Sequence, residues 1–293
     1  MPAPSPQYTQ SGFESLTVPT HLGTMAYQVS KPTDASATRE TLVFLHGFGG
    51  GSSSYEFSRV YPHFAPRYRV VAADLIGWGL SAHPDRSYQV ADYTETITEF
   101  LTQVCPEPPI VVASSLTAGL VCRLAVVAPE RFRKLLLITP TGLSDFGTDL
   151  SAPPITFLAG LPFVDNFIYE RFAADRGAIR QFLEQRLFAR PERVSEDIVD
   201  GYWWSANQPN AERAALSFLR GALSFDLAEF IPNLRTPAHF IWGAQAGFNT
   251  LETGRKLVLL NPQLELHVIE DCGLVPQLEK PEQTRALLAK LLE

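Results

Sequence analysis

Six short hydrophobic runs recur along the chain and predict the strands of a buried sheet. Each run is four to six residues long, is rich in Val, Ile, Leu and Phe, and is bounded by Gly, Pro or polar residues. Runs of this length without strict polar alternation are typical of strands that are covered on both faces. The predicted strands span residues 41–45, 68–73, 110–113, 134–139, 239–242 and 264–269.

Helical patterns separate these strands. Asp92 is placed to cap a helix whose apolar side chains recur on one face, namely Tyr93, Ile97, Phe100, Leu101 and Val104. A second helix is predicted over residues 116–128, and Pro281 opens the last one. Alternating strands and helices predict an α/β fold in which a mostly parallel central sheet carries helices on both faces.

The alternation stops between residues 144 and 232, where helical segments (176–188, 195–204 and 211–223) follow one another with almost no strand signal. We interpret residues 144–232 as an inserted helical cap. Residues 21–143 and 233–293 then form the core, and residues 1–20 a flexible N-terminal tail. Within the cap, the apolar run 155–164 is suited to line a ligand entrance, to pack onto the sheet or to rest on a membrane surface. We favour packing or lining.

Charge and cysteine content argue against several classes of protein. Twenty-four Lys and Arg residues face 31 Asp and Glu residues, which gives a formal net charge of −7 without any basic block. This balance argues against nucleic acid as a partner. The three cysteines, Cys105, Cys122 and Cys272, are odd in number and far apart, so they predict neither a disulfide framework nor a cysteine zinc site. A reducing compartment is expected.

Targeting and membrane signals are also missing. The first basic residue is Lys31, so the charged region of a signal peptide and the Arg-rich face of a transit peptide are both absent. The uncharged run 110–122 has only 13 residues, whereas about 20 are needed to cross a bilayer. We therefore expect a cytoplasmic protein without a transmembrane segment, in which the cap is the one place for peripheral membrane contact.

Three motifs follow predicted strands directly. The first, H-G-F-G-G-G at residues 46–51, fits neither phosphate-binding glycine pattern in its spacing, which leaves an oxyanion hole or a plain tight turn as its role. The second, D-L-I-G-W-G-L-S at residues 74–81, has two glycines that favour a structured loop rather than chemistry. The third places Ser115 between a strand and a helix without a linker, a geometry that strains the turn and presents the serine beside a helix N-terminus.

Together these motifs resemble the α/β-hydrolase superfamily, of the esterase, epoxide-hydrolase and C–C-hydrolase type, over about residues 21–293. The segment H-G-F-G-G is similar to the oxyanion loop of that superfamily, and A-S-S-L-T-A to its nucleophile elbow. The resemblance implies an α/β-hydrolase fold with an inserted cap. It also implies that Ser115 holds the nucleophile position and that the backbone N–H groups of Phe48 and Leu116 are the oxyanion donors.

The same resemblance shows which catalytic groups are replaced. Ala246 stands where the superfamily carries its acid, and Leu274 stands where it carries its base, in a segment that reads G-L-V-P instead of G-H-x-P. Ala113 and Thr117 replace two small glycines of the elbow. A serine hydroxyl is a weak nucleophile without a base, and that base needs a third group to orient it.

Other residues are candidates to substitute for the missing groups. Asp145 follows the strand after which some members of the superfamily carry their acid, and His46 lies in the oxyanion loop next to Ser115 in the predicted fold. His239 and His267 lie inside strand patterns, where we expect structural histidines of the core or the sheet edge.

Two principal hypotheses follow, and neither requires a metal or an organic cofactor. In the favoured one, the protein is a non-classical or catalytically inactive α/β-hydrolase member that binds a small apolar or acyl-type molecule, or a protein partner. In the alternative, it is an active hydrolase, esterase-like or acting on a related bond, or a lyase, with an unorthodox base. A third hypothesis assigns the apolar run of the cap to a membrane surface or to assembly.

Overall fold

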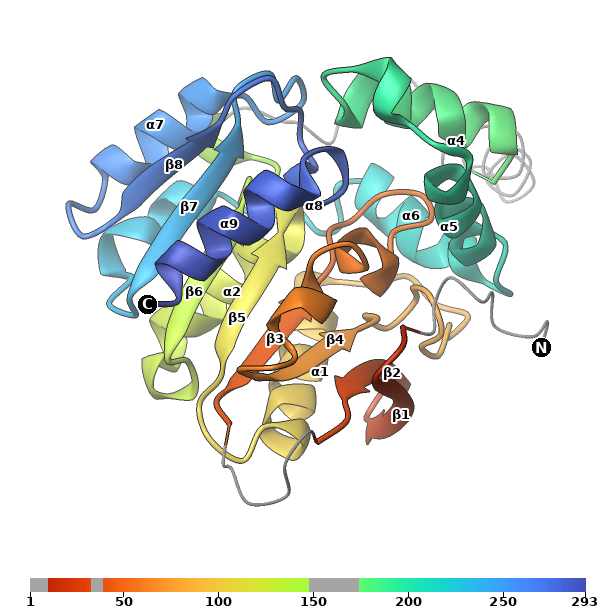
Figure 1. The fold of residues 1–293 in the computed structure, drawn as a ribbon, viewed down its shortest axis with the longest axis horizontal. Coiled ribbons are helices and arrows are strands. Elements are labelled where there is room, and N and C mark those ends of the chain that lie inside the picture. The colour runs from red at the N-terminus through yellow and green to blue at the C-terminus, as the bar shows by residue number, and fades with distance from the viewer. Residues whose placement is uncertain (1–9, 33–38, 148–173) are drawn as a thin grey trace.

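The computed structural model describes residues 10–32, 39–147 and 174–293 (Figure 1). These residues form one eight-stranded sheet with the order β1-β2-β4-β3-β5-β6-β7-β8. Strands β3 to β8 run parallel to one another, whereas β1 pairs antiparallel with β2 and β2 antiparallel with β4. The strands are β1 (Phe13–Thr20), β2 (Gly23–Ser30), β3 (Thr41–Leu45), β4 (Arg69–Ala73), β5 (Ile110–Ser114), β6 (Lys134–Ile138), β7 (Ala238–Gly243) and β8 (Glu265–Ile269).

The six predicted strands are confirmed as β3 to β8, each within one residue at either end. Strands β3, β5 and β6 are buried along nearly their whole length. Helices cover both faces of the sheet, which explains why the strands lack polar alternation.

The predicted tail over residues 1–20 needs correction at its C-terminal end, because residues 13–20 form strand β1. Only Phe13 and Val18 are buried on this strand, and most of its other side chains are exposed. β1 lies at the edge of the sheet, where its hairpin with β2 supplies the backbone hydrogen bonds. An edge strand with so few buried positions has no continuous apolar run for sequence reasoning to find.

The helices are α1 (Val90–Val104), α2 (Ser115–Val127), α4 (Arg176–Phe182), α5 (Glu196–Ala206), α6 (Ala211–Leu219), α7 (Leu251–Leu259), α8 (Pro276–Glu279) and α9 (Pro281–Leu291). One detail of the prediction is wrong, because Asp92 is not the N-cap of α1. The N-cap is Gln89, and the Asp92 carboxylate, one turn into the helix, accepts the Gln89 N–H at 2.7 Å. The two residues form a capping box.

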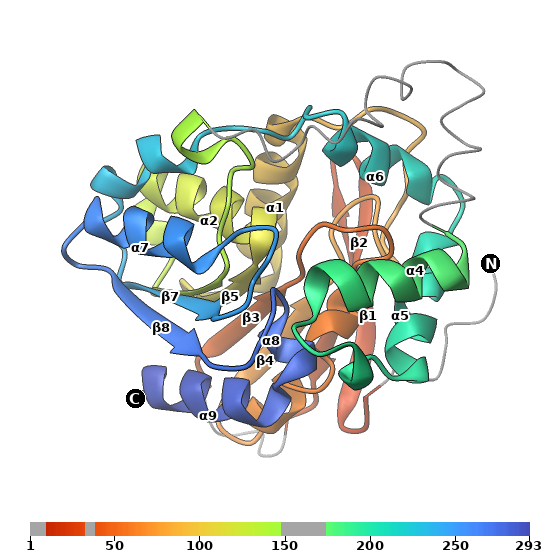
Figure 2. The same cartoon turned by 90° about the horizontal axis from the view of Figure 1, so that it is seen from above.

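Helices lie on both faces of the sheet (Figure 2). Helices α1, α2 and α7 pack on one face, where Ile97, Leu120 and Leu257 belong to the larger core cluster. Helix α9 lies on the other face, where Leu288 and Leu291 join a second cluster with aromatic residues that follow β3.

Helices α4, α5 and α6 come between β6 and β7 in the chain and lie beyond the carboxyl ends of the central strands (Figure 1). Ser205 on α5 accepts the Gly79 N–H at 3.1 Å and donates to the Ser52 carbonyl at 3.0 Å, so this helix is tied to the loops that follow β3 and β4. Tyr88, before α1, is tied in the same way to Ser217 on α6. The apolar run 155–164 lies outside the described residues.

Within the described ranges, none of the helices combines the length and the apolar character that a membrane crossing needs.

The loops that follow β7 and β8 pack against each other so closely that Gly243 has no room for a side chain. A Cβ added there would overlap with the carbonyl oxygen of Gly273. We expect Gly243→Ala to lower the free energy of unfolding by about 1–3 kcal/mol, the usual cost of overpacking, as measured by urea denaturation. Gly247→Ala is the matched control, since a Cβ at Gly247 meets no described atom within 4 Å. Equal losses in the two variants would contradict this close packing.

Candidate active site

Ser115 is the turn residue between β5 and α2. Its backbone φ is +55°, in the left-handed region that residues with a Cβ rarely adopt. Such a conformation costs on the order of 1–3 kcal/mol and persists only where the surroundings hold it. Helix α2 starts at Ser115 itself, so the following N–H groups, that of Leu116 first, have no partner within the helix. The chain thus presents a half-buried serine beside helix N–H groups that have no acceptor within α2.

The glycine-rich loop after β3 lies directly against this turn. A Cβ added at Gly47 would be 3.2 Å from the Ser115 Cβ. Gly47 donates its N–H to Glu56 Oε2 at 3.0 Å, and Glu56 Oε1 accepts the Tyr202 hydroxyl at 3.0 Å. Glu56 is buried. This carboxylate, which sequence reasoning missed, therefore fixes the loop that carries Phe48.

Thr117 adds a hydrogen bond between α2 and the loop that follows β3. Its hydroxyl donates to the His46 carbonyl at 2.6 Å, and its side chain is fully buried. The threonine, which we expect to replace a small glycine, therefore joins α2 to the loop that follows β3 through its hydroxyl.

The loop of the second motif is organised by Asp74. Its carboxylate accepts the N–H of Ser54 at 2.6 Å and the N–H of Leu80 at 2.8 Å. The Ser81 hydroxyl donates to the Asp74 carbonyl at 2.6 Å. Asp74 is buried and both carboxylate oxygens are engaged by backbone, so the motif shapes the loop.

Ala246 and Leu274 lie on two loops that are joined to each other at the carboxyl edge. Gln245 donates its N–H to the Cys272 carbonyl at 2.9 Å, and the Cys272 N–H returns a bond to Gln245 Oε1 at 2.8 Å. Both Ala246 and Leu274 are buried. The Leu274 carbonyl accepts the Thr139 hydroxyl at 3.2 Å, which places this residue beside the end of β6. The side chains of residues 246 and 274 are therefore both aliphatic and buried.

A charged clamp holds the Leu274 loop. The buried Glu279 accepts the N–H groups of Gly273 at 2.6 Å and Arg190 at 3.0 Å. Asp271 pairs with Arg193, with Arg190 at 2.6 Å and with Lys280 at 3.2 Å. These cations, Arg193 foremost, hold the pKa of the Asp271 carboxyl well below its usual range.

Asp145, a candidate acid, is buried within its own loop. Its carboxylate accepts the Thr141 hydroxyl at 2.7 Å and the N–H groups of Gly142 and Leu227, both at 2.9 Å. Burial raises the pKa of Asp145, and these three hydrogen bonds oppose that rise. The side chain anchors the loop after β6 to residues just before β7.

His46, a candidate base, has both ring nitrogens bonded to backbone. Nε2 accepts the Leu75 N–H at 3.0 Å, which leaves Nδ1 as the donor to the Gly47 carbonyl at 2.7 Å. His46 is fully buried. A ring held in this way joins the loops after β3 and β4 and has no nitrogen free to accept a proton from a serine.

The remaining histidines lie elsewhere. His21 contacts Glu99 on α1, His63 stacks edge-on against Phe64, and His239 and His267 face each other across β7 and β8. His83 is half-buried in the loop after β4. Burial lowers its pKa, and among the described atoms its Nε2 has no hydrogen-bond partner.

Comparison with known proteins agrees with this architecture. The model of the family described as "Alpha/beta hydrolase family" matches residues 42–287. The "Uncharacterized hydrolase YugF" of Bacillus subtilis (strain 168) is 26% identical over 246 residues, which are 83% of this chain and 86% of that protein. A 2-hydroxy-6-oxononadienedioate/2-hydroxy-6-oxononatrienedioate hydrolase of Paraburkholderia phymatum is 28% identical over 269 residues, or 88% of this chain and 89% of that protein.

Solved structures show the same fold. The crystal structure of Cfl2 from Burkholderia cenocepacia aligns with a TM-score of 0.79 at 22% identity and covers 99% of this chain and 98% of its own. The 2-hydroxy-6-oxo-6-phenylhexa-2,4-dienoate hydrolase from Rhodococcus sp. strain RHA1 aligns with a TM-score of 0.74 at 23% identity and covers 95% and 98%.

The lowered pKa of Asp271 predicts an acid-sensitive clamp. Its ion pairs contribute stability that is present above the usual Asp pKa of about 3.9 and is lost as the pH falls through the lowered value. We expect Asp271→Asn to lower the free energy of unfolding at neutral pH and to flatten its decrease below about pH 4. Urea denaturation across this range measures both effects. Parallel pH profiles for variant and wild type would contradict the assignment.

Proposed function

The chain belongs to the alpha/beta hydrolase family, and we propose that it is a non-classical member that binds a small apolar molecule with a carbonyl group. In this proposal Ser115 holds the nucleophile position but is not activated by a histidine and an acid. The observation that carries the proposal is a contrast between two parts of the site. The turn at Ser115 has the left-handed φ expected of a nucleophile elbow, whereas Ala246 and Leu274, which the family resemblance puts at the positions of acid and base, are buried aliphatic side chains.

The groups that remain suit recognition of a carbonyl oxygen. The proposed donors are the backbone N–H groups of Phe48 and Leu116, which no side-chain replacement removes. The Gly47 contact with Ser115 and the bond between Thr117 and His46 support their proximity. Two convergent N–H groups stabilise a partially negative oxygen whether or not a covalent step follows.

Aliphatic residues at the proposed positions of acid and base favour an apolar ligand. An ionised carboxylate and an imidazole in a closed site must be paired or solvated, and a ligand that covers them without pairing them is penalised. Ala246 and Leu274 carry no such requirement. Among the relatives reported above, those whose names state a substrate are hydrolases of small oxo compounds, which supports a carbonyl-bearing small molecule as the ligand.

Acetophenone and ethylbenzene test this proposal, because they have similar size and differ in the carbonyl oxygen. Two hydrogen bonds of about 0.7 kcal/mol each predict that acetophenone binds about tenfold more tightly. Isothermal titration calorimetry or ligand-observed NMR measures both affinities.

The matched variant is Ser115→Ala, which removes the hydroxyl and keeps the backbone donors. We expect its affinity for acetophenone to stay within about twofold of wild type, because the hydroxyl contributes no required bond. Equal affinity for the two compounds, or a tenfold loss in Ser115→Ala, would overturn the proposal.

A second candidate function, that of an active serine hydrolase with an unorthodox base, is favoured by the φ of +55° at Ser115. An activated serine reacts with fluorophosphonates, whereas an unassisted hydroxyl does not. We expect no Ser115-dependent labelling of the wild type at neutral pH, read by intact mass. Labelling that disappears in Ser115→Ala would establish the active hydrolase instead.

The double variant Ala246→Asp/Leu274→His is the positive control for this experiment. It supplies a base together with the carboxylate that orients it, on loops already joined through Gln245 and Cys272. We expect labelling of the double variant and little labelling of Leu274→His alone.

A further inference from the structure

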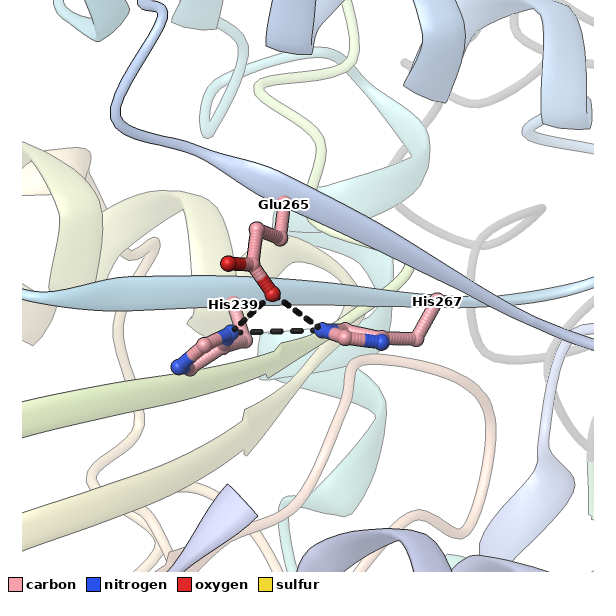
Figure 3. A group of neighbouring side chains, drawn as sticks. All are labelled: His239, Glu265 and His267. Carbon is pink, nitrogen blue, oxygen red and sulfur yellow. Dashed lines mark hydrogen bonds and ion pairs between the residues drawn. The ribbon is translucent and has the colours of Figure 1, made fainter. Parts of the chain in front are cut away.

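A group of two histidines and a glutamate lies on strands β7 and β8, outside the candidate active site (Figure 3). His239 Nδ1 is 3.2 Å from His267 Nε2, and Glu265 Oε2 is 3.5 Å from each of these nitrogens. The three atoms therefore form a nearly equilateral triangle. In Figure 3 the Glu265 carboxylate and the two imidazole rings point toward one another.

The size of this triangle matches the coordination shell of a tetrahedral metal ion. Zinc binds imidazole nitrogen at about 2.0–2.1 Å and carboxylate oxygen at about 2.0–2.2 Å. Two ligand atoms at such distances, separated by the tetrahedral angle, lie about 3.3–3.4 Å apart. The observed separations of 3.2, 3.5 and 3.5 Å bracket this value. Octahedral magnesium and calcium prefer oxygen ligands, of which this group offers one.

Strand register brings the three side chains together. His239 is the register partner of Glu265, and His267 is that of Ile241. Glu265 and His267 are two residues apart on β8, so they point to the same face of the sheet. That face also carries Ile241 and Ile269, which pack in the cluster that includes α9. The group thus lies where the covered part of this face gives way to solvent.

The exposure of the group leaves room for a fourth ligand. The side chains of His239 and His267 are 21% and 23% exposed, whereas that of Glu265 is 66% exposed. Lys134, on the neighbouring strand β6, donates its ammonium to the Leu291 carbonyl at 2.7 Å, which fixes that cation on a different partner. A site with three protein ligands and one open position is the usual arrangement for zinc that keeps a bound water.

We propose that His239, Glu265 and His267 form a zinc-binding site that joins the edge strand β8 to β7. The site lies toward the amino ends of these parallel strands, whereas Ser115 follows the carboxyl end of β5. It is therefore separate from the candidate active site and does not depend on the function proposed for it. A bound ion links the two strands whose following loops carry Ala246 and Leu274, so it stabilises the fold by binding the folded state alone.

A second histidine and glutamate group in the protein supplies the matched control. His21 Nε2 lies 3.5 Å from Glu95, and His21 Nδ1 lies 3.1 Å from Glu99. The two ring nitrogens point in opposite directions to different carboxylates, so this group offers one ion a single nitrogen and a single oxygen. His21→Gln removes a histidine beside carboxylates without touching the proposed site.

The experiment uses the full chain, stripped with a chelator and dialysed, and titrated with Zn²⁺ in a calorimeter. We expect one zinc ion per chain, with affinity at least about tenfold weaker in His239→Gln and in His267→Gln and unchanged in His21→Gln. Thermal denaturation is the second measurement, since added Zn²⁺ raises the melting temperature of wild type and of His21→Gln and not that of the other two variants.

Glu265→Gln keeps the test decisive if a histidine variant fails to fold, because this exposed side chain is not part of the core. It is expected to weaken zinc binding by at least about tenfold while circular dichroism stays that of the wild type. Substitution with Co²⁺ should give the intense visible absorption of a tetrahedral site. No stoichiometric zinc binding, or the same affinity in wild type, His267→Gln and Glu265→Gln, would overturn the proposal.

Discussion

The backbone passes from β5 into α2 within one residue, and the left-handed conformation of Ser115 that this requires has to be held in place. Thr117 is bonded to the His46 carbonyl, Gly47 lies against the Ser115 Cβ, and the buried Gln277 donates to the Ser114 hydroxyl at 3.3 Å. The partners of the turn come from two other parts of the chain, the loop after β3 and helix α8. The strained turn is therefore held between the loop after β3 and helix α8, which lie together at the carboxyl edge of the sheet.

The loops after β7 and β8 are held by a different kind of interaction. Gln245 and Cys272 join the two loops through backbone and amide groups. Glu279 and Asp271 both pair with Arg193, which holds the loop after β8. Charge is thus present near the Leu274 position but is directed away from it, onto backbone N–H groups and cations. Ala246 and Leu274 themselves are buried aliphatic side chains, which is consistent with the apolar ligand that we propose.

Sequence reasoning found the features that local pattern determines. Strands β3 to β8 are buried on both faces and so appear as apolar runs, and the turn at Ser115 follows from a strand that meets a helix without a linker. Strand β1 was missed because few of its residues are buried. Glu56 and Glu279 were missed for another reason: each is a buried carboxylate that binds a residue distant in sequence, Tyr202 and Arg190 respectively. The group of His239, Glu265 and His267 depends on the register between two strands, which no local pattern states.

The strain at Ser115 also bears on what the site is for. A positive φ at this residue orients the first peptide groups of α2 as well as the serine side chain. The contacts around the turn offset a cost of about 1–3 kcal/mol, and under the proposed function, without an acid and a base, the hydroxyl alone gives this strain no role in chemistry. The same turn, however, sets the Leu116 N–H beside the loop that carries Phe48, and backbone donors act on a carbonyl oxygen without any base. In the proposed function, the placement of these donors accounts for the strained turn even with Leu274 in place of a histidine.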